Sequence, residues 1–332
     1  MSTGTGEDRA EATGAPRRLG IVGTLVWDTI WTLEDLERGT PFHSWGGIGY
    51  SLAAAAAARP EGWEIVPIVK VGRDLESEAR DFLASLPGVS VGPSVRVVPE
   101  RNNRVELRYL SPSHRDESQS GAIPGWSWDE LAPHLEGLDA LFVNFISGCE
   151  LALPAAEALR RSYSGLLYTD LHSLFLGPPG AGARERRLLP DWERWAACFD
   201  VVQLNEEELR TLDPAEPGIL ELARRLAEGA SGPSGGPGLV LVTQGAAGAS
   251  FLSLGRGPGG PPRSGYVPVP GGGIEGDPTG SGDVWGATLV CGLAAGLPVE
   301  DTILRAHRAA ARKMGVRGAS ELYAHLASAP PP

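Results

Sequence analysis

A glycine-rich loop that carries two aspartates lies near the end of the chain, where it could hold an anion. The stretch GGGIEGDPTGSGDVWGATLVCGLAAG, residues 271–296, begins as a loop and ends as an apolar run with helical spacing. Its glycines would let backbone N–H groups approach an anion, and the start of a helix adds a positive field. Asp283 would compete with that anion, which favours a different role, that of accepting a proton from an alcohol during phosphoryl transfer. The loop alone is equally compatible with a tight turn followed by an acidic first helical turn.

Several other phosphate-binding patterns are excluded. A Walker loop needs a glycine-lysine pair, but the only lysines are Lys70 and Lys313, and neither follows a glycine. The chain has no H-R-D or D-F-G motif of protein kinases. Residues 20–30 contain no G-x-G-x-x-G motif, so a dinucleotide site in the first unit of the sheet is not indicated.

The composition describes an acidic globular chain. It has 332 residues, 42% hydrophobic and 21% charged, and a formal net charge of −12 at pH 7. That charge repels polyanions, so nucleic acid is not expected as a partner and a phosphate must be held by local groups. Three widely spaced cysteines, Cys149, Cys198 and Cys291, are typical of reduced thiols in a cytoplasmic protein. No membrane span is expected, because the longest alanine-rich run, residues 51–58, is too short.

Short apolar runs alternate with longer amphipathic ones along most of the chain. Strands are expected at residues 19–26, 63–72, 138–145, 165–171, 199–204, 238–243, 247–254 and 266–270. Helices are expected at residues 48–58, 75–86, 149–163, 205–212, 281–296, 299–316 and 319–327. This order predicts an α/β fold with helices on both faces of a mostly parallel central sheet. Ligands in such sheets bind beyond the carboxyl ends of the strands.

Two β-prone segments, residues 29–45 and 90–112, do not fit that alternation. We interpret them as a small accessory sheet, a lid over the ligand-binding edge; the alternative is that they are excursions of the main sheet. Residues 1–18 have no apolar segment typical of a signal peptide and are expected to form a disordered tail. The remainder, residues 19–328, is expected to be one domain.

Six short motifs, in order, resemble those of one family. GDPTGSGDVWGA (276–287) resembles the C-terminal signature of ribokinase-like (PfkB-type) carbohydrate kinases. The other five are GIVGTLVWD (20–28), WGGIGYSLAAAAA (45–57), VKVGRD (69–74), NEEE (205–208) and VTQGAAGA (242–249). The resemblance extends from about residue 19 to 327. It implies a ribokinase-like three-layer α/β/α sandwich with a mostly parallel central sheet and a small β lid.

The resemblance implies a role for each matching residue. Asp283 would be the base for the acceptor hydroxyl, and the backbone of Gly280, Ser281 and Gly282 would form the anion hole. Glu208 would organise Mg²⁺ and the phosphates through water. The other implied contacts are Asn205, Thr243, Gly245, Gly248 and His307 on the nucleotide side and Asp28, Gly46, Gly47 and Ser51 on the sugar side.

The activity implied by the resemblance is ATP-dependent phosphorylation of an alcohol group on a sugar or sugar-like substrate. ATP and Mg²⁺ are the implied cofactors, and K⁺ is a further candidate because some relatives require it. The lid would close over the sugar and exclude water. Because the lid forms a dimer interface in many relatives, a homodimer through the lid is also a candidate.

Some of these residues have a plain structural alternative. Asn205 could simply cap the following helix, with Glu208 completing a capping box, and Thr243 could be only a strand residue. Ser51 stands where the family has asparagine and reaches less far, so the usual recognition of ribose or fructose is in doubt. Gly276 replaces an apolar residue, and nothing in the sequence explains this.

Further polar and aromatic residues fall near the expected site. Asn144 and Asp170 end predicted strands and would face the ligand edge, whereas His172 more often makes a local hydrogen bond. Trp27, Trp31, Trp45 and Tyr50 cluster in sequence around the sugar-binding motifs. They could stack on a ring-shaped substrate, including a nucleoside, or simply pack the lid and core.

Two other functions therefore stay open beside the carbohydrate kinase. One is a nucleoside kinase. The other is a catalytically silent sugar-binding or regulatory protein with the same fold, although the intact Asp283 and its glycines argue against it.

Overall fold

The computed structural model describes residues 15–111, 114–177, 184–230, 235–272 and 276–328. The first fourteen residues of the expected tail lie outside this part of the chain. The first strand already begins at Arg17, two residues earlier than expected, because its arginines have partners: Arg17 and Arg18 form ion pairs with Asp139 and Glu64.

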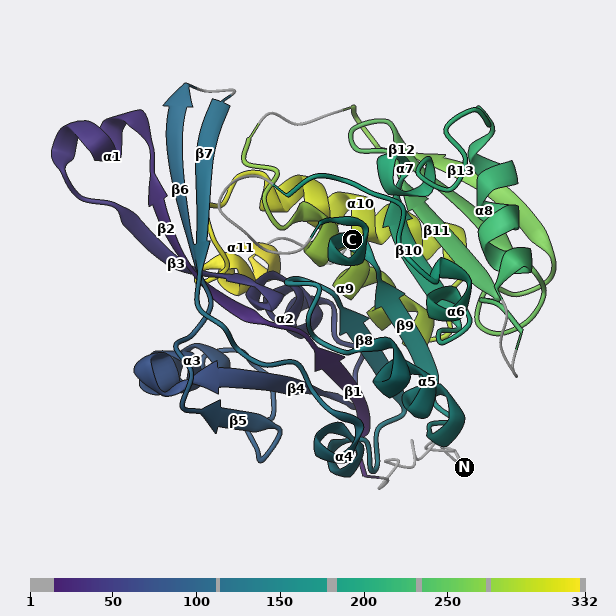
Figure 1. The fold of residues 1–332 in the computed structure, drawn as a ribbon, viewed down its shortest axis with the longest axis horizontal. Helices are drawn as coiled ribbons and strands as arrows, with labels where there is room; N and C mark the ends of the chain where they lie inside the picture. Colours follow the sequence, from purple (N-terminus) through teal and green to yellow (C-terminus); the bar gives the residue numbers. More distant parts are fainter. Residues whose placement is uncertain (1–14, 112–113, 178–183, 231–234, 273–275, 329–332) are drawn as a thin grey trace, which may run out of the picture.

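Nine strands form the central sheet, in the order β13-β12-β11-β10-β9-β8-β1-β4-β5 among the described residues (Figure 1). The strands are β1 (Arg17–Val22), β4 (Trp63–Gly72), β5 (Val95–Val98), β8 (Ala140–Asn144), β9 (Leu166–Asp170), β10 (Val201–Asn205), β11 (Leu239–Thr243), β12 (Gly248–Ser253) and β13 (Arg263–Pro268). Pairing is parallel from β5 to β11, and β12 and β13 are antiparallel. The mostly parallel sheet predicted from the sequence is therefore confirmed.

Helices cover both faces of this sheet. The helices are α1 (Leu33–Arg38), α2 (Ile48–Ala58), α3 (Glu76–Ala84), α4 (Trp128–Leu131), α5 (Leu153–Ser162), α6 (Trp192–Ala196), α7 (Glu206–Leu209), α8 (Ile219–Gly229), α9 (Ser281–Ala294), α10 (Val299–Lys313) and α11 (Leu322–Ala327). One apolar core lies under α2, α3, α9, α10 and α11, and a second lies under α4 to α8. Helix α8 was not predicted, although its apolar residues recur at helical spacing.

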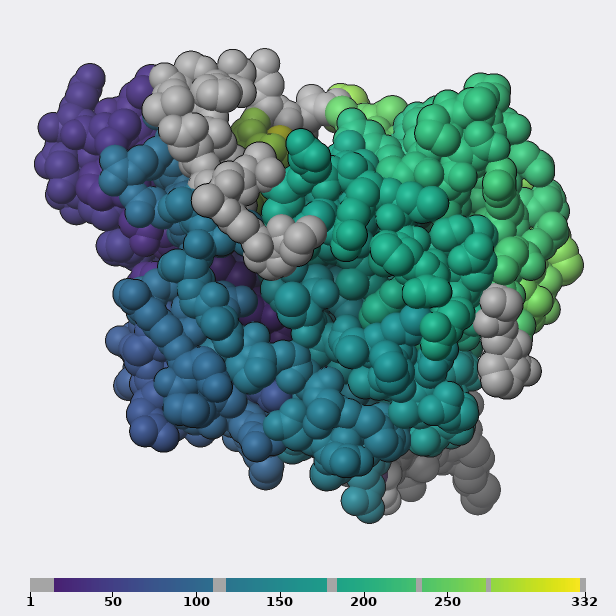
Figure 2. Space-filling view, in the orientation of Figure 1, coloured from purple at the N-terminus to yellow at the C-terminus, as the bar shows by residue number. Residues whose placement is uncertain are grey.

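A second, four-stranded sheet has the order β3-β2-β6-β7. Its strands are β2 (Leu25–Trp31), β3 (Phe42–Gly47), β6 (Arg104–Ser111) and β7 (His114–Ser120). We call this sheet together with α1 the lid. It stands at one edge of the molecule, and α1 forms its outer corner (Figures 1 and 2).

The bounds of the lid differ from the prediction. The single strand expected at residues 19–26 is two strands, because the chain leaves the central sheet after Val22 and enters the lid at Leu25. Residues 95–98, assigned to the lid, instead pair with β4 at the edge of the central sheet, where Val95 and Val98 are buried. Strand β7 was not predicted, since its polar sequence carries little β signal.

Candidate active site

A cavity of about 1190 Å³ lies where the carboxyl ends of β8, β9 and β10 face the lid. Many of the residues singled out in the sequence line it: Asp28, Gly47, Asn144, Asp170, Asn205, Glu208, Thr243, Gly280, Gly282 and Asp283. They come from segments far apart in the chain. This matches the expectation that a ligand binds beyond the strand ends.

The start of helix α9 forms one wall of the cavity. Gly280 caps the helix with φ +78°, and a Cβ there would lie 2.4 Å from the Tyr50 ring, so the turn needs glycine for two reasons. The first N–H groups of an α-helix have no partner within the helix, and no described side chain caps this one. The wall can therefore bind an anion through the backbone.

Asp283 follows in the first turn of α9 and lines the cavity. Its Oδ1 accepts a hydrogen bond of 2.7 Å from Asn144 Nδ2, which also donates to Ser51 Oγ at 2.9 Å. Burial raises the pKa of Asp283 to about 6, although the bond from Asn144 works against the rise. Near pH 7 the group is thus an ionised carboxylate that is a much better base than an exposed aspartate.

Asp28 faces the same cavity from β2 in the lid. The residue is 5% exposed, and its carboxylate packs directly on Gly46, where a Cβ would lie 1.9 Å from Oδ2. Gly46 therefore shapes the site without lining the cavity itself. Asp28 on β2 and Asp283 on α9 thus line one cavity, which the sequence could not establish.

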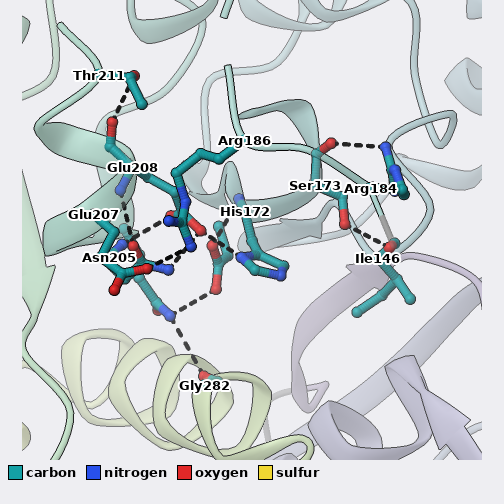
Figure 3. Close-up of polar contacts among 12 residues, drawn as sticks. Ile146, His172, Ser173, Arg184, Arg186, Asn205, Glu207, Glu208, Thr211 and Gly282 are labelled. Atoms are coloured by element: carbon teal, nitrogen blue, oxygen red, sulfur yellow. Dashed lines mark hydrogen bonds and ion pairs between the residues drawn. The ribbon is translucent and has the colours of Figure 1, made fainter. Parts of the chain in front are cut away.

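A cluster of polar residues continues the cavity along the ends of β9 and β10 (Figure 3). Glu208 is 1% exposed and forms an ion pair with His172 Nδ1. Its other contacts are with Asn205, whose backbone N donates to Oε2 at 2.8 Å and whose Nδ2 donates to Oε1 at 2.6 Å. Asn205 in turn caps α7 through the N–H of Glu208. The capping box considered from the sequence is thus present, on the wall of the cavity.

Charges within this cluster shift each other's pKa. Burial, and secondly the charge of Glu208, raise the pKa of Asp170 to about 7. Burial lowers the pKa of His172, but the bond to Glu208 outweighs it and raises the pKa to about 9. Near pH 7 His172 is therefore a cation beside Glu208, a partnership that the sequence analysis did not anticipate.

Gln203 connects this cluster to α9. Its Nε2 donates to Asp170 Oδ2 at 2.7 Å and lies 3.4 Å from the Gly282 carbonyl oxygen, and its Oε1 accepts from Tyr168 at 2.5 Å. Sequence reasoning missed this residue. The available signal was a polar side chain between apolar ones in the second half of the run FDVVQL, close to the end of the expected strand.

Glu150 was also missed. It is 2% exposed, and its carboxylate accepts from Thr24 Oγ1 and from the backbone N–H groups of Ile146, Ser147 and Gly148 at 2.7 to 3.1 Å. These bonds shape the loop after β8, which lines the cavity. Glu150 is therefore a positioning residue rather than a ligand contact.

Other predicted residues lie outside the cavity. His307 is buried, with Nδ1 accepting from Trp285 Nε1 at 3.1 Å and Nε2 lying 3.0 Å from the Val267 carbonyl oxygen, so its ring is a core group. Gly245, Gly248 and Ser281 do not line the cavity. Thr243, at the end of β11, does line it.

The aromatic residues near the sugar motifs divide in the same way. Tyr50 lines the cavity, and its buried hydroxyl has no hydrogen-bond partner among the described residues. Trp27 packs edge-on against Trp45, and Trp31 lies under Arg108, and none of these three tryptophans lines the cavity. The arrangement favours the packing alternative for the tryptophans.

Two further properties of the described residues concern metals and membranes. No group of three or more His, Cys, Asp or Glu side chains among them could hold a metal ion by itself. Within the same residues, every helix is too short or too polar to span a membrane.

One family model matches part of the chain. Residues 182–325 match the family model described as pfkB family carbohydrate kinase. The matched part contains α9, Asp283 and the Asn205–Glu208 motif. No curated protein matches the chain in sequence.

Solved structures match over nearly the whole length. A pyrophosphate-dependent kinase in the ribokinase family, complexed with a pyrophosphate analog and myo-inositol, is 20% identical with a TM-score of 0.69, covering 89% of this chain and 94% of its own. The nucleoside kinase from Burkholderia thailandensis, complexed with inosine, is 16% identical with a TM-score of 0.65 and coverage of 93% and 95%. The ribokinase from Cryptococcus neoformans var. grubii, complexed with ADP, is 19% identical with a TM-score of 0.64 and coverage of 94% and 97%.

The fold is therefore that of ribokinase-family kinases. The resemblance to ribokinase-like (PfkB-type) carbohydrate kinases that was drawn from six sequence motifs is confirmed by the family match and by the fold.

Proposed function

We propose that the protein is an ATP-dependent phosphotransferase that phosphorylates an alcohol group of a sugar or sugar-like molecule. One observation carries the proposal. Asp283, the backbone N–H groups at the start of α9, and Asp28 of the lid line one cavity. That combination supplies a base, an anion hole and a hydroxyl-binding carboxylate.

The reaction follows from these positions. An acceptor hydroxyl held by Asp28 gives its proton to Asp283 as its oxygen forms a bond to the terminal phosphorus of the donor. The bond between that phosphorus and the bridging oxygen breaks, and the leaving phosphate chain keeps the electron pair. The backbone N–H groups of Gly280 and Gly282 stabilise the charge on the transferring group, whereas that of Ser281, expected to join them, donates to the Pro278 carbonyl oxygen at 3.0 Å. Asn144 holds the Asp283 carboxylate in place at 2.7 Å.

The residues of the polar cluster fit a Mg²⁺ ion that keeps several waters. Asp170 and Glu208 present carboxylate oxygens on the cavity wall, the ligand type that Mg²⁺ prefers, and the donor's phosphates would complete its shell. A bound Mg²⁺ would neutralise charge on the phosphates. Because Glu208 already bonds to Asn205 and His172, its contact would run through water.

The shape of the cavity supports a second candidate donor beside ATP. Of the five residues expected near the nucleotide, Asn205 and Thr243 line the cavity, whereas Gly245, Gly248 and His307 lie outside it. A donor without a base, such as pyrophosphate, would need only the phosphate subsite. A pyrophosphate-dependent kinase shares this fold at a TM-score of 0.69. Rates with ATP, ADP and pyrophosphate at saturating acceptor would decide; a preference for pyrophosphate over ATP would replace the first choice.

The acceptor side favours a polyhydroxylated molecule over a nucleoside. Asp28, Asn103, Arg104, Gln119 and Ser120 supply polar groups there. No described tryptophan lines the cavity, and the Tyr50 ring, which does, is only 2% exposed and packs on Gly280, so little aromatic surface is available to stack on a base. A coupled assay over sugars, cyclitols and nucleosides tests this choice. A kcat/KM highest for a nucleoside would support the nucleoside kinase instead.

The same assay separates an enzyme from a silent binding protein. A binding protein would show sugar affinity by calorimetry but no turnover with any donor. The intact base and anion hole argue for turnover, since a silent protein has no need of either.

Further properties are part of the proposal. Residues 19–328 act as one kinase domain, and the lid closes over the acceptor. Leu33 and Leu36 are 47% and 38% exposed on α1, the helix at the outer corner of the lid (Figure 1), which supports a homodimer through this surface. Light scattering of the native protein and of Leu36→Asp would test it; a monomeric native protein contradicts it. The free cysteines are consistent with a cytoplasmic enzyme.

A further inference from the structure

Lys313 places a buried ammonium group against the loop that leads into the anion hole. Its side chain is 0% exposed, at the end of α10. Nζ donates to the main-chain oxygen of Asp277 at 2.9 Å and lies 3.2 Å from its carboxylate Oδ2. The same ammonium lies 5.3 Å from the centre of the Tyr50 ring, which packs on Gly280.

The end of α10 is docked on this loop by further contacts. The Asp277 backbone N donates to the Met314 carbonyl oxygen at 3.1 Å, and Ser281 Oγ lies 3.5 Å from Met314 Sδ. A Cβ on Gly276 would lie 2.1 Å from the same carbonyl oxygen, which accounts for the glycine that the sequence left unexplained. These contacts hold the end of α10, and with it Lys313, in a fixed position relative to the anion hole.

Asp277 links the Lys313 ammonium to the turn before α9. Its Oδ1 accepts from the Thr279 backbone N at 3.0 Å while its Oδ2 faces Lys313. Burial alone would raise the pKa of Asp277, but the bonds from Thr279 and the charge of Lys313 hold it below its usual value. One ionised carboxylate thus links the ammonium to the residue that precedes Gly280.

Lysine is a rare residue in this chain. Of its 29 lysines and arginines only two are lysines, and both are buried, at 3% exposure for Lys70 and 0% for Lys313. The others are all arginines. A compact ammonium on a flexible stem can occupy a small oxygen-lined place that a planar guanidinium cannot.

These contacts do not fit a potassium ion at this place. A cation supporting the loop would need the oxygens of Asp277, and Lys313 already occupies both the carbonyl and the carboxylate. We propose that the Lys313 ammonium is a built-in monovalent cation that positions the anion hole, so that neither the fold nor the reaction needs K⁺. The catalytic part of this inference rests on the proposed function.

The test compares the native protein with Lys313→Ala in potassium, ammonium or tetramethylammonium chloride at equal ionic strength. The native protein should have the same Tm, and rates within about twofold, in all three salts. Lys313→Ala should lose about 100-fold in kcat in tetramethylammonium, since its anion hole is no longer held. Ammonium or K⁺ should raise the kcat of Lys313→Ala by at least about tenfold and its Tm by about 2 °C or more, because a small cation can bind in the place that the lysine leaves.

Lys70→Ala is the matched control, because Lys70 is the other buried lysine and bonds to the Gly125 carbonyl oxygen and Glu130. It should lose stability, but its kcat should not depend on which cation is present, because neither partner of Lys70 belongs to the loop before α9. A native protein whose Tm or rate rises with K⁺, a fully active Lys313→Ala variant, or a folded variant that no small cation restores would each overturn the proposal. The native comparison stands even if the variant does not fold.

The Tm readout separates this inference from the proposed function. If no donor and acceptor give turnover, the proposed function fails. The salt-dependence of Tm in the native protein and the variant still decides whether Lys313 replaces a monovalent cation.

Discussion

The two walls of the cavity are held in different ways. The α9 wall is tied to the interior by buried groups: Asn144 donates to Asp283 at 2.7 Å, and Lys313 donates to Asp277. Asn144 is 1% exposed and the Lys313 side chain 0%, so water does not compete for these bonds. Polar bonds in such surroundings are strong and specify one geometry.

Buried bonds also hold the base of the lid, where Asn102 Nδ2 donates to the Leu25 carbonyl oxygen at 3.1 Å, but the start of β6 is held by ion pairs that water reaches. Arg104 and Arg101 pair with Asp74 at 2.7 and 3.8 Å, with side-chain exposures of 25% and 68%. Exposed ion pairs of this kind contribute little stability. The difference indicates that the wall with the proposed base is held rigidly, as stabilisation of a transition state would require, whereas the outer part of the lid can adjust with a small change in free energy.

The strongest test of the rigid wall is Asp283→Asn. The amide keeps the shape but cannot accept the proton, so kcat should fall by about 10³-fold or more. Asp301→Asn, an exposed acid on α10, is the matched control and should leave kcat unchanged. Near-normal turnover in a folded Asp283→Asn protein would remove the proposed base.

Asp28→Asn tests the opposite wall. Loss of a charged acceptor of hydrogen bonds should raise the KM for the acceptor and lower kcat/KM by about 10- to 100-fold. The KM for the phosphoryl donor serves as the internal control and should stay the same. An equal rise in both constants would mean that Asp28 shapes the whole cavity instead of binding the acceptor.

The pH dependence of kcat should report on Asp283. Its pKa is raised to about 6, so the carboxylate is ionised above that pH and protonated below it. Activity should therefore be lost as pH falls, by about tenfold between pH 7 and pH 5. The acidic limb of a kcat profile measures this directly, and a limb near pH 4 would place the base elsewhere.

Tyr50→Phe probes where the two walls meet. The Tyr50 hydroxyl is buried without a partner among the residues that the structure describes, so its removal should not lower the Tm. If the hydroxyl bonds to the bound acceptor, the KM for the acceptor should rise by about tenfold. An unchanged KM would assign Tyr50 to packing against Gly280 alone.

The smallest effect is expected in the lid. Arg101 is 68% exposed and 3.8 Å from Asp74, so Arg101→Ala should leave the Tm unchanged and shift the KM for the acceptor by no more than about twofold. A large loss of activity would show that the lid is held as firmly as the α9 wall. That result would contradict the contrast drawn between the walls.

Local patterns predicted much of the central sheet and part of the site. Continuous apolar runs such as LVLVT of β11 are buried strands, and the glycine loop before α9 lies at a helix start on the cavity wall. Strand β7 and helix α8 were missed, the first because its residues are polar and the second because turn residues surround it. Residues 95–98 were assigned to the wrong sheet because both sheets contain β-prone valines.

The sequence by itself determined the loop on which the proposed phosphate chemistry rests, because the glycines, the helix start and the first-turn aspartate are all set within a few neighbouring residues. Only the tertiary structure decided what surrounds that loop. It brought Gln203, Glu150 and Lys313 to the site and placed the His307 ring in the core. These contacts join residues far apart in the chain, so they depend on how elements pack and leave no local pattern.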